Sequence, residues 1–469
     1  MMTLHQALDW VTSARLSAAL VGDGRVQISR VHTDTRTLQP GDLFVALKGE
    51  RFDANEFLVL ARDQGAVAAI AHQGLTAAGL PGLEVSDSKL AMGQLAAGWR
   101  SQFDLTLIAV AGSNGKTTVT QMIASILRDW KQGNAFSTEG NLNNDIGVPL
   151  TLLRLRRNHQ VGVVELGMNH AGEIAYLAGL TKPTVALVNN AQREHLEFMA
   201  TVEAVAHENG SVIESLDAQG IAVFPADDDY TPVWRKMAGS RTVLTFSAPG
   251  AADVIADVTA QAHWLGNGWL VRAATPSGPL EFTLQIAGRH NVKNALAATA
   301  CALAAGVPLA CIAAGLSDFV PVKGRSRAVL LSVNGRAVSL IDDTYNANPD
   351  SMRAAIEVLA TLPGPRLLVM GDMGEVGDQG PQFHQEAGLL ARELGVEKLF
   401  ALGLQSERAA GSFEQGRHFS DIEAMNAAVL AELPQLGSVL VKGSRFMKME
   451  RVVQAITAHS QIQQPEEKI

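Results

Sequence analysis

One short segment places glycines, a lysine and two threonines at the spacing of a phosphate-binding loop. It reads Ala111-Gly112-Ser113-Asn114-Gly115-Lys116-Thr117-Thr118. Glycines let the backbone turn so that N–H groups point at phosphate oxygens, the lysine reaches the β- and γ-phosphates, and a threonine hydroxyl can ligate Mg²⁺. The strict pattern has a glycine six residues before the lysine, where this chain has Val110, so the loop is a shortened variant. We predict that residues 112–118 bind ATP phosphates; the alternative is a glycine turn capped by hydroxyl groups.

Two metal-binding side chains follow expected strands. Glu165 comes directly after the apolar run 161–164, and His195 lies beyond the run 185–188 and Asn190. Open α/β sheets bind ligands at the carboxyl ends of their strands. A carboxylate and an imidazole near a phosphate loop could hold magnesium ions that bridge ATP and an acceptor. For His195 a partly exposed packing role is an equally open interpretation.

Residues 138–149 gather side-chain amides in one loop. Asn141, Asn143 and Asn144 both donate and accept hydrogen bonds, which suits a sugar, a peptide or a pyrophosphate. Turn formation, which also favours Asn, Asp and Gly, is the alternative.

Charged side chains also follow strands that are expected in the last third of the chain. The apolar run 338–341 leads into residues 342–350, which include Asp343 and Asn346, and Arg325 lies upstream. A carboxylate at a strand end can bind ribose hydroxyls, and a guanidinium can clamp a phosphoryl group. The alternative is an Asx turn that starts a helix near Ser351. Residues 371–375 and 442–445 lie at further strand ends.

The elements that position these residues alternate between strands and helices, which is typical of parallel sheets covered by helices. In the middle of the chain we expect strands at 105–110, 161–164, 185–188 and 221–224, helices at 117–130, 173–180 and 291–305, and antiparallel strands at 243–246 and 269–282. Near the end we expect strands at 338–341, 367–370, 399–402 and 439–441. The fold class is α/β with three domains: a small mixed α/β domain (1–86), a central P-loop ATPase-like domain with a mainly parallel sheet (87–316) and a C-terminal Rossmann-like domain (317–469).

Composition supports several globular domains. The chain has 469 residues, 47% hydrophobic and 18% charged, and at about 150 residues per domain it should hold three. With 38 basic and 47 acidic residues its formal charge is −9, which argues against nucleic acid or anionic membrane as a partner.

Residues 1–12 lack an export signal, and no apolar run approaches the roughly 20 residues of a membrane span. Two cysteines, Cys301 and Cys311, form no disulfide framework and are expected to be buried. We expect a cytoplasmic protein without membrane insertion.

Six separated segments together resemble the ATP-dependent Mur ligase family of bacterial cell-wall synthesis. They are TEGNLNNDIGVP (138–149), ELGMNHAGE (165–173), RHNVKN (289–294), DDTYNANP (342–349), residues 370–375 and residues 441–445. Their common order over nearly the whole chain is far more specific than a phosphate loop alone.

The resemblance implies three domains with separate tasks. The N-terminal domain would hold the UDP end of a substrate, the central domain would bind ATP, and the C-terminal domain would swing in to complete the site. The implied residue roles are UDP-substrate contacts (Thr33, Asp34, Thr35, Arg36, Lys48 and Gly49), phosphate and Mg²⁺ contacts (Lys116 and Thr117), metal ligands (Thr117, Glu165 and His195), adenine neighbours (Asn291 and Asn294) and C-terminal contributions to the ATP site (Arg325 and Asp343).

The chemistry that the resemblance implies is amide-bond formation through acyl activation. A terminal carboxylate attacks the γ-phosphorus of ATP, and an amine then displaces phosphate from the acyl phosphate. The amide-rich segment and DDTYNANP favour the branch that joins D-alanyl-D-alanine to UDP-N-acetylmuramoyl-tripeptide, so these are the expected small-molecule substrates. The expected catalytic residues are Lys116, Glu165, His195 and Arg325, with two Mg²⁺ ions. Asn141, Asn143, Asn144 and Asn346 are expected substrate contacts, and the enzyme is expected to be a monomer.

One departure from the family is informative. The family carries a lysine shortly after the histidine, carboxylated to a carbamate that helps hold the second metal. Residues 196–220 contain no lysine, and Asn209 takes its place. We expect the second magnesium to be held without a carbamate, through water or a nearby carboxylate such as Glu208.

Other functions predict different requirements. A folylpolyglutamate synthase or another Mur enzyme would use a different amino acid, and a P-loop motor or switch would hydrolyse ATP without an acceptor. A nicotinamide oxidoreductase would need a GxGxxG after a strand with an acidic residue about 20 positions later, which the sequence lacks. A non-enzymatic binding module would leave the metal-type residues at three strand ends unexplained.

Overall fold

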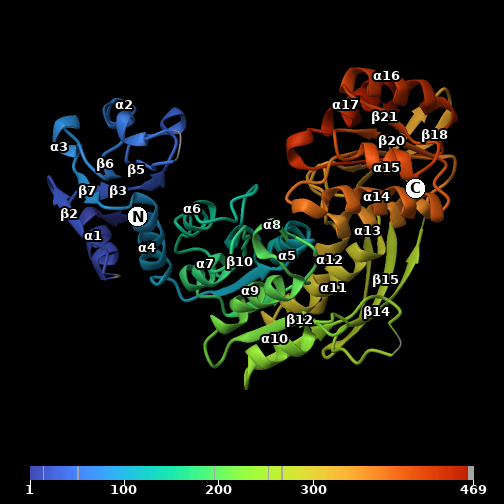
Figure 1. The fold of residues 1–469 in the computed structure, drawn as a ribbon. Helices are drawn as coiled ribbons and strands as arrows, with labels where there is room; N and C mark the ends of the chain where they lie inside the picture. Colours follow the sequence, from blue (N-terminus) through green and yellow to red (C-terminus); the bar gives the residue numbers. More distant parts are fainter. Residues whose placement is uncertain (14, 50–51, 195, 252, 266–267, 463–469) are drawn as a thin grey trace.

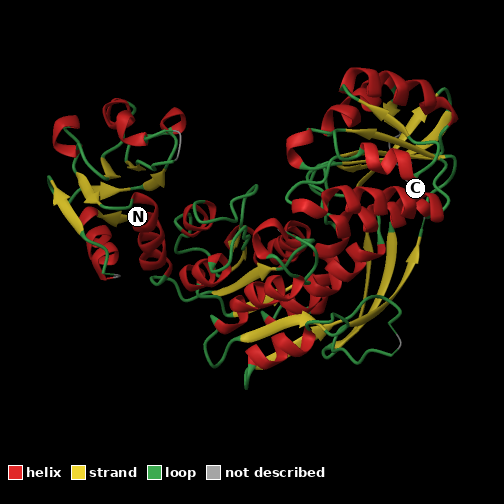
Figure 2. Cartoon of the chain, viewed as in Figure 1, coloured by secondary structure: helices red, strands yellow, loops and turns green. Residues whose placement is uncertain are grey.

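The computed structural model describes residues 1–13, 15–49, 52–194, 196–251, 253–265 and 268–462. Three units follow one another along the chain, each built around its own main sheet (Figure 1). The central unit lies between the other two, and in the view of Figure 1 the N-terminal and C-terminal units stand on opposite sides of it. Figure 2 shows helices gathered around the strands of each unit, which agrees with the expected α/β class.

The N-terminal unit holds a five-stranded sheet in the order β2-β7-β6-β5-β4. Strand β2 is antiparallel to β7, and the other neighbours are parallel. The strands are β2 (Ala18–Val21), β4 (Arg30–His32), β5 (Asp42–Val45), β6 (Ala68–Ala71) and β7 (Gly82–Val85), with a separate antiparallel pair, β1 (Met2–Thr3) and β3 (Gln27–Ile28). The helices are α1 (Leu4–Ser13), α2 (Leu58–Asp63) and α3 (Leu75–Ala78).

Helix α4 (Ser88–Arg100) joins this unit to the next. Asp87 caps it, because its side chain accepts hydrogen bonds from the backbone N–H groups of Lys89 and Leu90. The helix packs against α1 on one side and against α6 and α7 of the central unit on the other. The predicted boundary after residue 86 lies between β7 and α4, and the one after residue 316 lies one residue before the end of α12; both stay predictions.

The central sheet is fully parallel, in the order β13-β12-β11-β8-β10-β9. Its strands are nearly continuous apolar runs, as parallel strands buried on both faces require. They are β8 (Thr106–Ala111), β9 (Ala135–Ser137), β10 (Val161–Glu165), β11 (Val185–Val188), β12 (Ile221–Pro225) and β13 (Thr242–Phe246). The helices of this part are α5 (Lys116–Lys131), α6 (Gly147–Leu152), α7 (Glu173–Thr181), α8 (Leu196–Met199), α9 (Val202–Glu214) and α10 (Thr231–Ala238).

The expected antiparallel direction of residues 243–246 is wrong. Strand β13 pairs in parallel with β12 over five residues. Helix α10 connects the two strands in the sequence and returns the chain to the edge of the sheet at which β12 begins. Neighbouring strands that are joined by such a helical crossover run in parallel. The expected antiparallel strands at 269–282 are confirmed by a meander of β14 (Thr259–Trp264), β15 (Trp269–Thr275) and β16 (Gly278–Leu284).

Two helices close the central unit, α11 (Arg289–Ala304) and α12 (Leu309–Ser317). Both pack against α5, so the helix after the phosphate loop is buried along most of its length. Cys301 is buried in α11, as expected, and burial raises the pKa of its thiol. Cys311 on α12 is half-buried, so the expectation of full burial is wrong for this residue.

The C-terminal unit has a seven-stranded sheet in the order β21-β20-β19-β22-β18-β17-β23. Five neighbouring strands are parallel, and β17 and β23 add an antiparallel edge. The strands are β17 (Arg327–Val333), β18 (Arg336–Asp343), β19 (Arg366–Gly371), β20 (Lys398–Leu402), β21 (Arg417–Phe419), β22 (Ser438–Lys442) and β23 (Gln461–Ile462). The helices are α13 (Pro349–Ala360), α14 (Gly380–Glu393), α15 (Glu407–Ser412), α16 (Ile422–Glu432) and α17 (Glu450–His459). Among the described residues, no helix combines the length and the apolar character that crossing a membrane needs.

Candidate functional site

A cavity of about 1000 Å³ lies where the central unit faces the C-terminal unit. On the central side it is lined by the phosphate loop and by residues that follow β10, β11 and β12. Because β8 lies between β10 and β11, the carboxyl ends of these three strands meet at one edge of the sheet. The predicted phosphate loop and Glu165 therefore share one cavity.

Backbone geometry at two glycines gives the phosphate loop its shape. Gly112 has φ +130° and Gly115 has φ +80°, values that side chains with a Cβ rarely adopt. A Cβ on Gly112 would lie 2.9 Å from the backbone nitrogen of Asn189, and one on Gly115 would lie 2.7 Å from Oδ1 of Asn294. Both positions therefore need glycine for conformation and for space.

Residues that follow β11 hold the loop in place. The N–H of Asn114 donates to Oδ1 of Asn190 at 2.8 Å, and its carbonyl accepts from the side-chain amides of Asn189 and Asn190 at 2.8 and 3.0 Å. The N–H of Gln192 donates to Oγ of Ser113 at 2.9 Å. These hydrogen bonds fix the shape of the loop.

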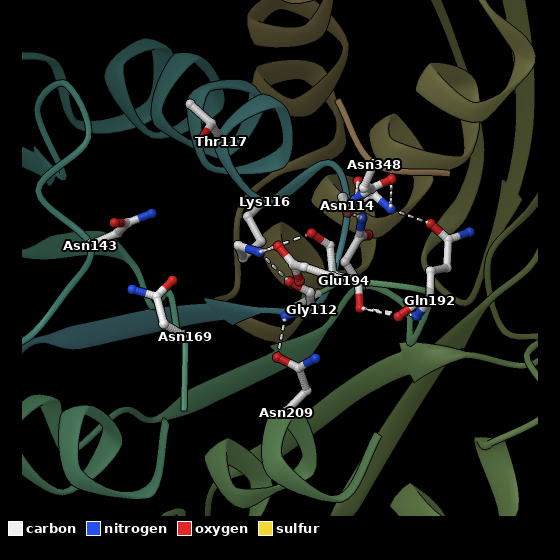
Figure 3. A network of polar contacts seen from close by, with 12 residues as sticks. Gly112, Asn114, Lys116, Thr117, Asn143, Asn169, Gln192, Glu194, Asn209 and Asn348 are labelled. Atoms are coloured by element: carbon white, nitrogen blue, oxygen red, sulfur yellow. Dashed lines mark hydrogen bonds and ion pairs between the residues drawn. The ribbon is translucent and has the colours of Figure 1, made fainter. Parts of the chain in front are cut away.

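Lys116 has a full set of hydrogen bonds inside the cavity (Figure 3). Its Nζ donates to the carbonyls of Gly112 at 2.6 Å and Ser113 at 2.9 Å, and to Oε1 of Glu194 at 2.8 Å. The Lys116 and Glu194 side chains are 13% and 14% exposed, so solvent screens this ion pair little. Both residues of the pair line the cavity.

Thr117 and Glu165 form the second polar contact of the loop. Thr117 Oγ1 donates to Oε1 of the buried Glu165 at 2.9 Å, and Nδ2 of Asn143 donates to the same oxygen at 2.8 Å. Hydroxyl and carboxylate oxygens are the ligands that Mg²⁺ prefers, with nucleotide phosphates and water completing its shell. Among the described residues, no three His, Cys, Asp or Glu side chains lie close enough to form a metal cage. The Thr117 hydroxyl and the Glu165 carboxylate are donors of the kind that fit a magnesium ion.

Asn291 and Asn294 lie on α11 beside the loop. Oδ1 of Asn294 accepts from Nδ2 of Asn189 at 3.0 Å, and Nδ2 of Asn294 donates to Oδ1 of Asn291 at 3.0 Å. Nearby, Lys293 pairs with Asp227 after β12 at 2.7 Å. These groups line the cavity and join the phosphate loop to the predicted adenine side.

The C-terminal unit adds cations to the same cavity. The Arg325 guanidinium lies 4.0 Å from the ring centre of Tyr345, and its buried Nε has no hydrogen-bond partner among the described residues. Lys442 donates to Oδ2 of Asp343 at 2.6 Å, and Ser326 N–H donates to Oδ1 at 2.9 Å. Burial alone would raise the pKa of Asp343, but Lys442 and these hydrogen bonds bring it below its usual value. Asp343 is therefore held as a carboxylate.

Arg193 and Asn114 contact the C-terminal unit from the phosphate-loop side. Arg193 donates to Asp350 through its backbone N–H at 2.7 Å, Nε at 3.1 Å and Nη2 at 2.7 Å. Nδ2 of Asn348 donates to Oδ1 of Asn114 at 2.9 Å. Asn348 also caps α13, so the Asx turn predicted before Ser351 is present in addition to a contact with the loop.

The predicted N-terminal residues do not line this cavity. Asp34 caps a 3₁₀ turn and pairs with the exposed Arg36, which lowers the pKa of Asp34 to about 2. Thr33 is half-buried, and Lys48 lies 3.9 Å from Asp53. These residues belong to the N-terminal unit, and in Figure 1 that unit and the C-terminal unit stand on opposite sides of the central unit.

The remaining predicted residues divide between the cavity and local structure. Asn141 and Asn346 line the cavity, as do Ser113, Thr118 and Asn144. Oδ1 of Asn144 also accepts from the N–H of Gly147, the first residue of α6, at 2.8 Å, which agrees with the turn interpretation of the amide-rich loop. His195 lies outside the described residues, so its predicted metal and catalytic roles stay predictions.

Helix α9 places Asn209 and Glu208 in structural roles. Asn209 is buried and its Oδ1 accepts from Gly112 N–H at 2.9 Å (Figure 3). Both oxygens of Glu208 accept from backbone N–H groups at the start of α7, Gly172 at 2.8 Å and Ile174 at 2.7 Å. Neither side chain lines the cavity. Glu208 is thus occupied as a helix cap, away from the position expected for a metal ligand.

Sequence reasoning missed Arg193, Glu194 and Lys293, which all line the cavity. The first two follow β11, where the strand-end rule that picked out Glu165 also applies. Asp350 belongs to the segment 342–350 after β18, for which the sequence predicts no separate role of Asp350. Its partner Arg193 lies 157 positions earlier, and a single sequence gives no signal for that pairing.

Three parts of the chain match models of one family. Residues 27–100 match the Mur ligase family catalytic domain, residues 110–302 the Mur ligase middle domain, and residues 326–445 the domain described as Mur ligase, glutamate ligase domain. The matches follow the order of the three units.

Curated relatives cover almost the whole chain. It is 42% identical to UDP-N-acetylmuramoyl-tripeptide–D-alanyl-D-alanine ligase of Escherichia coli (strain K12), over 95% of this chain and 98% of that protein. It is 32% identical to the ligase of the same name from Bacillus subtilis (strain 168), over 91% of this chain and 92% of that protein.

Solved structures are similar over the same extent. MurF from Acinetobacter baumannii is 36% identical with a TM-score of 0.86, covering 96% of this chain and 98% of that one. MurF from Thermotoga maritima, solved in complex with ADP, is 25% identical with a TM-score of 0.81, covering 92% and 98%. Escherichia coli FolC, at 17% identity and a TM-score of 0.60, shares the fold alone.

Proposed function

Because the chain belongs to the Mur ligase family, we propose that it joins D-alanyl-D-alanine to UDP-N-acetylmuramoyl-tripeptide with ATP. The products are UDP-N-acetylmuramoyl-pentapeptide, ADP and phosphate, and the reaction supplies peptidoglycan precursors. The observation that carries the proposal is 42% identity over 95% of the chain to a ligase of that name. A cavity that combines a phosphate loop with cations from two units supports it.

The reaction has two steps. An oxygen of the tripeptide's terminal carboxylate attacks the γ-phosphorus, the bond to the β–γ bridging oxygen breaks, and ADP leaves. The amine of D-alanyl-D-alanine then attacks the acyl carbon, phosphate leaves, and the amine loses a proton. Two anions must meet in the first step, so positive charge must lie between them.

The chain's own residues supply that charge and the orientation. Lys116 and the loop N–H groups would hold the β- and γ-phosphates, and Arg325 would reach the transferred phosphoryl group from the C-terminal unit. Thr117, Glu165 and His195 would hold magnesium, which neutralises phosphate charge when bound. Asn291 and Asn294 would lie beside the adenine, and Asp343 would complete the nucleotide site.

The amino acid substrates would lie along the amide-rich loop. Asn141, Asn143 and Asn144 would contact the peptide from the central unit and Asn346 from the C-terminal unit, while Thr33, Asp34, Arg36 and Lys48 would hold the UDP end. The three units would act as the domains 1–86, 87–316 and 317–469 of a cytoplasmic monomer. Closure of the C-terminal unit would exclude water, which otherwise hydrolyses the acyl phosphate.

We also propose that the second metal is held without a lysine carbamate. Asn209 stands where the family has that lysine, and its hydrogen bond to Gly112 supports a structural role. Activity that collapses when bicarbonate is stripped from the buffer would contradict this proposal.

The test is phosphate release with a panel of substrates. ATP consumption should require both UDP-N-acetylmuramoyl-tripeptide and D-alanyl-D-alanine, and single D-amino acids should not replace the dipeptide. Faster release with L-glutamate and a folate acceptor would favour a folylpolyglutamate synthase, and full-rate hydrolysis with neither acceptor would favour a motor or switch.

A further inference from the structure

The end of β22 brings two cations, Lys442 and Arg445, to the cavity. Lys442 is buried and donates to the Asp343 carboxylate at 2.6 Å and to the carbonyl of Asn346 at 2.8 Å, so its charge is compensated within the fold. The Arg445 side chain is 68% exposed, and its contact with Glu450 is 3.5 Å long, which is at the far limit for a hydrogen bond. Arg445 is therefore a cation that a ligand in the cavity can reach.

The balance of charge along the cavity wall makes such a cation significant. Carboxylates outnumber the lysine and arginine side chains among the described residues that line the cavity, so an anion binds only where positive charge is locally in excess. Four of the cations are paired with a carboxylate at 2.6 to 2.8 Å: Lys116 with Glu194, Arg193 with Asp350, Lys293 with Asp227, and Lys442 with Asp343. The guanidinium groups of Arg325 and Arg445 lie instead 4.0 Å and 5.6 Å from the ring centre of Tyr345. Positive charge is therefore in excess beside this ring.

Contacts on several sides hold Arg445 in position. The N–H of Ser444, the preceding residue, donates to the carbonyl of Asp372 at 3.0 Å, which fixes the backbone. The guanidinium lies over the ring of Tyr345, and Nη1 contacts Glu450. A guanidinium has five N–H donors in a planar fork, so Arg445 keeps donors for two parallel hydrogen bonds to a carboxylate.

The acceptor of the proposed reaction carries a carboxylate of this kind. Its amine attacks only in the neutral form, so the dipeptide reacts as an anion whose charge lies on its terminal carboxylate. Burial of that carboxylate without a cation would be costly. A dipeptide is at most about 7 Å long, and Arg325, which is proposed to contact the transferred phosphoryl group, lies at the same aromatic ring as Arg445. The geometry therefore allows the amine to reach the acyl phosphate beside Arg325 while the carboxylate contacts Arg445.

We propose that Arg445 binds the terminal carboxylate of the acceptor dipeptide and selects acceptors that end in a free carboxylate. The inference rests on the proposed function and adds which group of the dipeptide is recognised and by which side chain. Tyr345 and Glu450 orient the guanidinium. Arg445 is thus a specificity-determining residue for the acceptor and contributes nothing to nucleotide binding.

The test is steady-state kinetics with two acceptors, D-alanyl-D-alanine and D-alanyl-D-alaninamide, in which an amide replaces the carboxylate. The full chain is compared as wild type, Arg445→Gln and Arg445→Lys. The control for net charge is Arg408→Gln, an exposed arginine of α15 that does not line the cavity. The value of kcat/KM is measured for each acceptor, together with KM for ATP, and melting temperatures establish that the variants fold.

Wild type is expected to use the acid about 10- to 100-fold better than the amide, the scale of one charged hydrogen bond. Arg445→Gln should lower kcat/KM for the acid by the same factor, through KM for the acceptor, and leave kcat/KM for the amide and KM for ATP near their wild-type values. Arg445→Lys should keep part of the preference, because it keeps the charge and loses the fork. Arg408→Gln should match wild type.

Two results with Arg445→Gln would overturn the inference. An equal loss with acid and amide would mean that Arg445 only supports the fold, and an unchanged preference for the acid would mean that another group binds the carboxylate. A wild type that uses acid and amide equally well would also refute carboxylate recognition and leave the proposed function standing. A wild type that turns over neither acceptor would refute the proposed function itself.

Discussion

The contact between Arg193 and Asp350 should decide how firmly the C-terminal unit is held over the phosphate loop. The perturbations are Arg193→Ala, Asp350→Asn and the double variant. Arg193 follows β11, Asp350 lies in the first turn of α13, and three hydrogen bonds of 2.7 to 3.1 Å connect them. The neighbouring carboxylates raise the pKa of Arg193, Asp350 first among them.

The magnitude follows from burial. A charged hydrogen bond in a buried setting contributes about 1.5–3 kcal/mol, whereas a fully exposed ion pair contributes about 0–1 kcal/mol. The Arg193 and Asp350 side chains are 25% and 19% exposed, so this pair lies between those limits. We expect about 1–2 kcal/mol, which is roughly a five- to thirtyfold shift in the equilibrium between docked and undocked C-terminal units.

The assay is a distance distribution between labels on the central and C-terminal units, measured together with kcat for the ligase reaction. Both single variants should broaden the distance distribution and lower kcat. The double variant should be no more impaired than the more impaired of the two single variants, because both substitutions remove the same contact. Arg128→Ala, an exposed arginine of α5, is the matched control. Strict additivity of the two substitutions, or distributions identical to wild type, would refute the reasoning.

Three further predictions concern single residues. Asn209→Ala leaves Gly112 N–H without its acceptor, at a cost of about 1–3 kcal/mol, so steady-state kinetics should show KM for ATP raised about tenfold; an unchanged KM would contradict the loop-positioning role. The lowered pKa of Asp343 gives stability that is present above the unfolded value of about 3.9 and is lost as pH falls through the folded pKa. The difference in Tm between wild type and Asp343→Asn should therefore shrink below about pH 4, and a constant difference would be evidence against it. Peptide mapping should find Cys301 protected from iodoacetamide in the native protein at about pH 8 and alkylated after unfolding, since burial raises its thiol pKa; native alkylation would show that α11 opens.

The phosphate loop and Glu165 could be predicted because their signals are local. A strand, a glycine-rich turn and a helix follow one another within residues 106–131, and Glu165 ends an apolar strand. The strand-end rule then places both at one edge of the sheet without knowledge of strand order.

What could not be predicted depends on contacts between distant segments. The direction of β13 follows from a crossover through α10, and residues 242–246 alone suit either direction. The pairing of Arg193 with Asp350 spans 157 positions, and the contact of Lys116 with Glu194 spans 78. Glu208 illustrates the opposite case, since the carboxylate next to Asn209 in sequence faces the start of α7 in the structure, while Asn209 itself contacts the loop.

The most direct test of the account follows one oxygen atom. UDP-N-acetylmuramoyl-tripeptide labelled with ¹⁸O in its terminal carboxylate is turned over with ATP and D-alanyl-D-alanine, and the released phosphate is analysed by mass. Attack of the carboxylate on the γ-phosphorus predicts one labelled oxygen in each phosphate. Phosphate that carries its new oxygen from water would contradict the acyl phosphate and, with it, the proposed reaction.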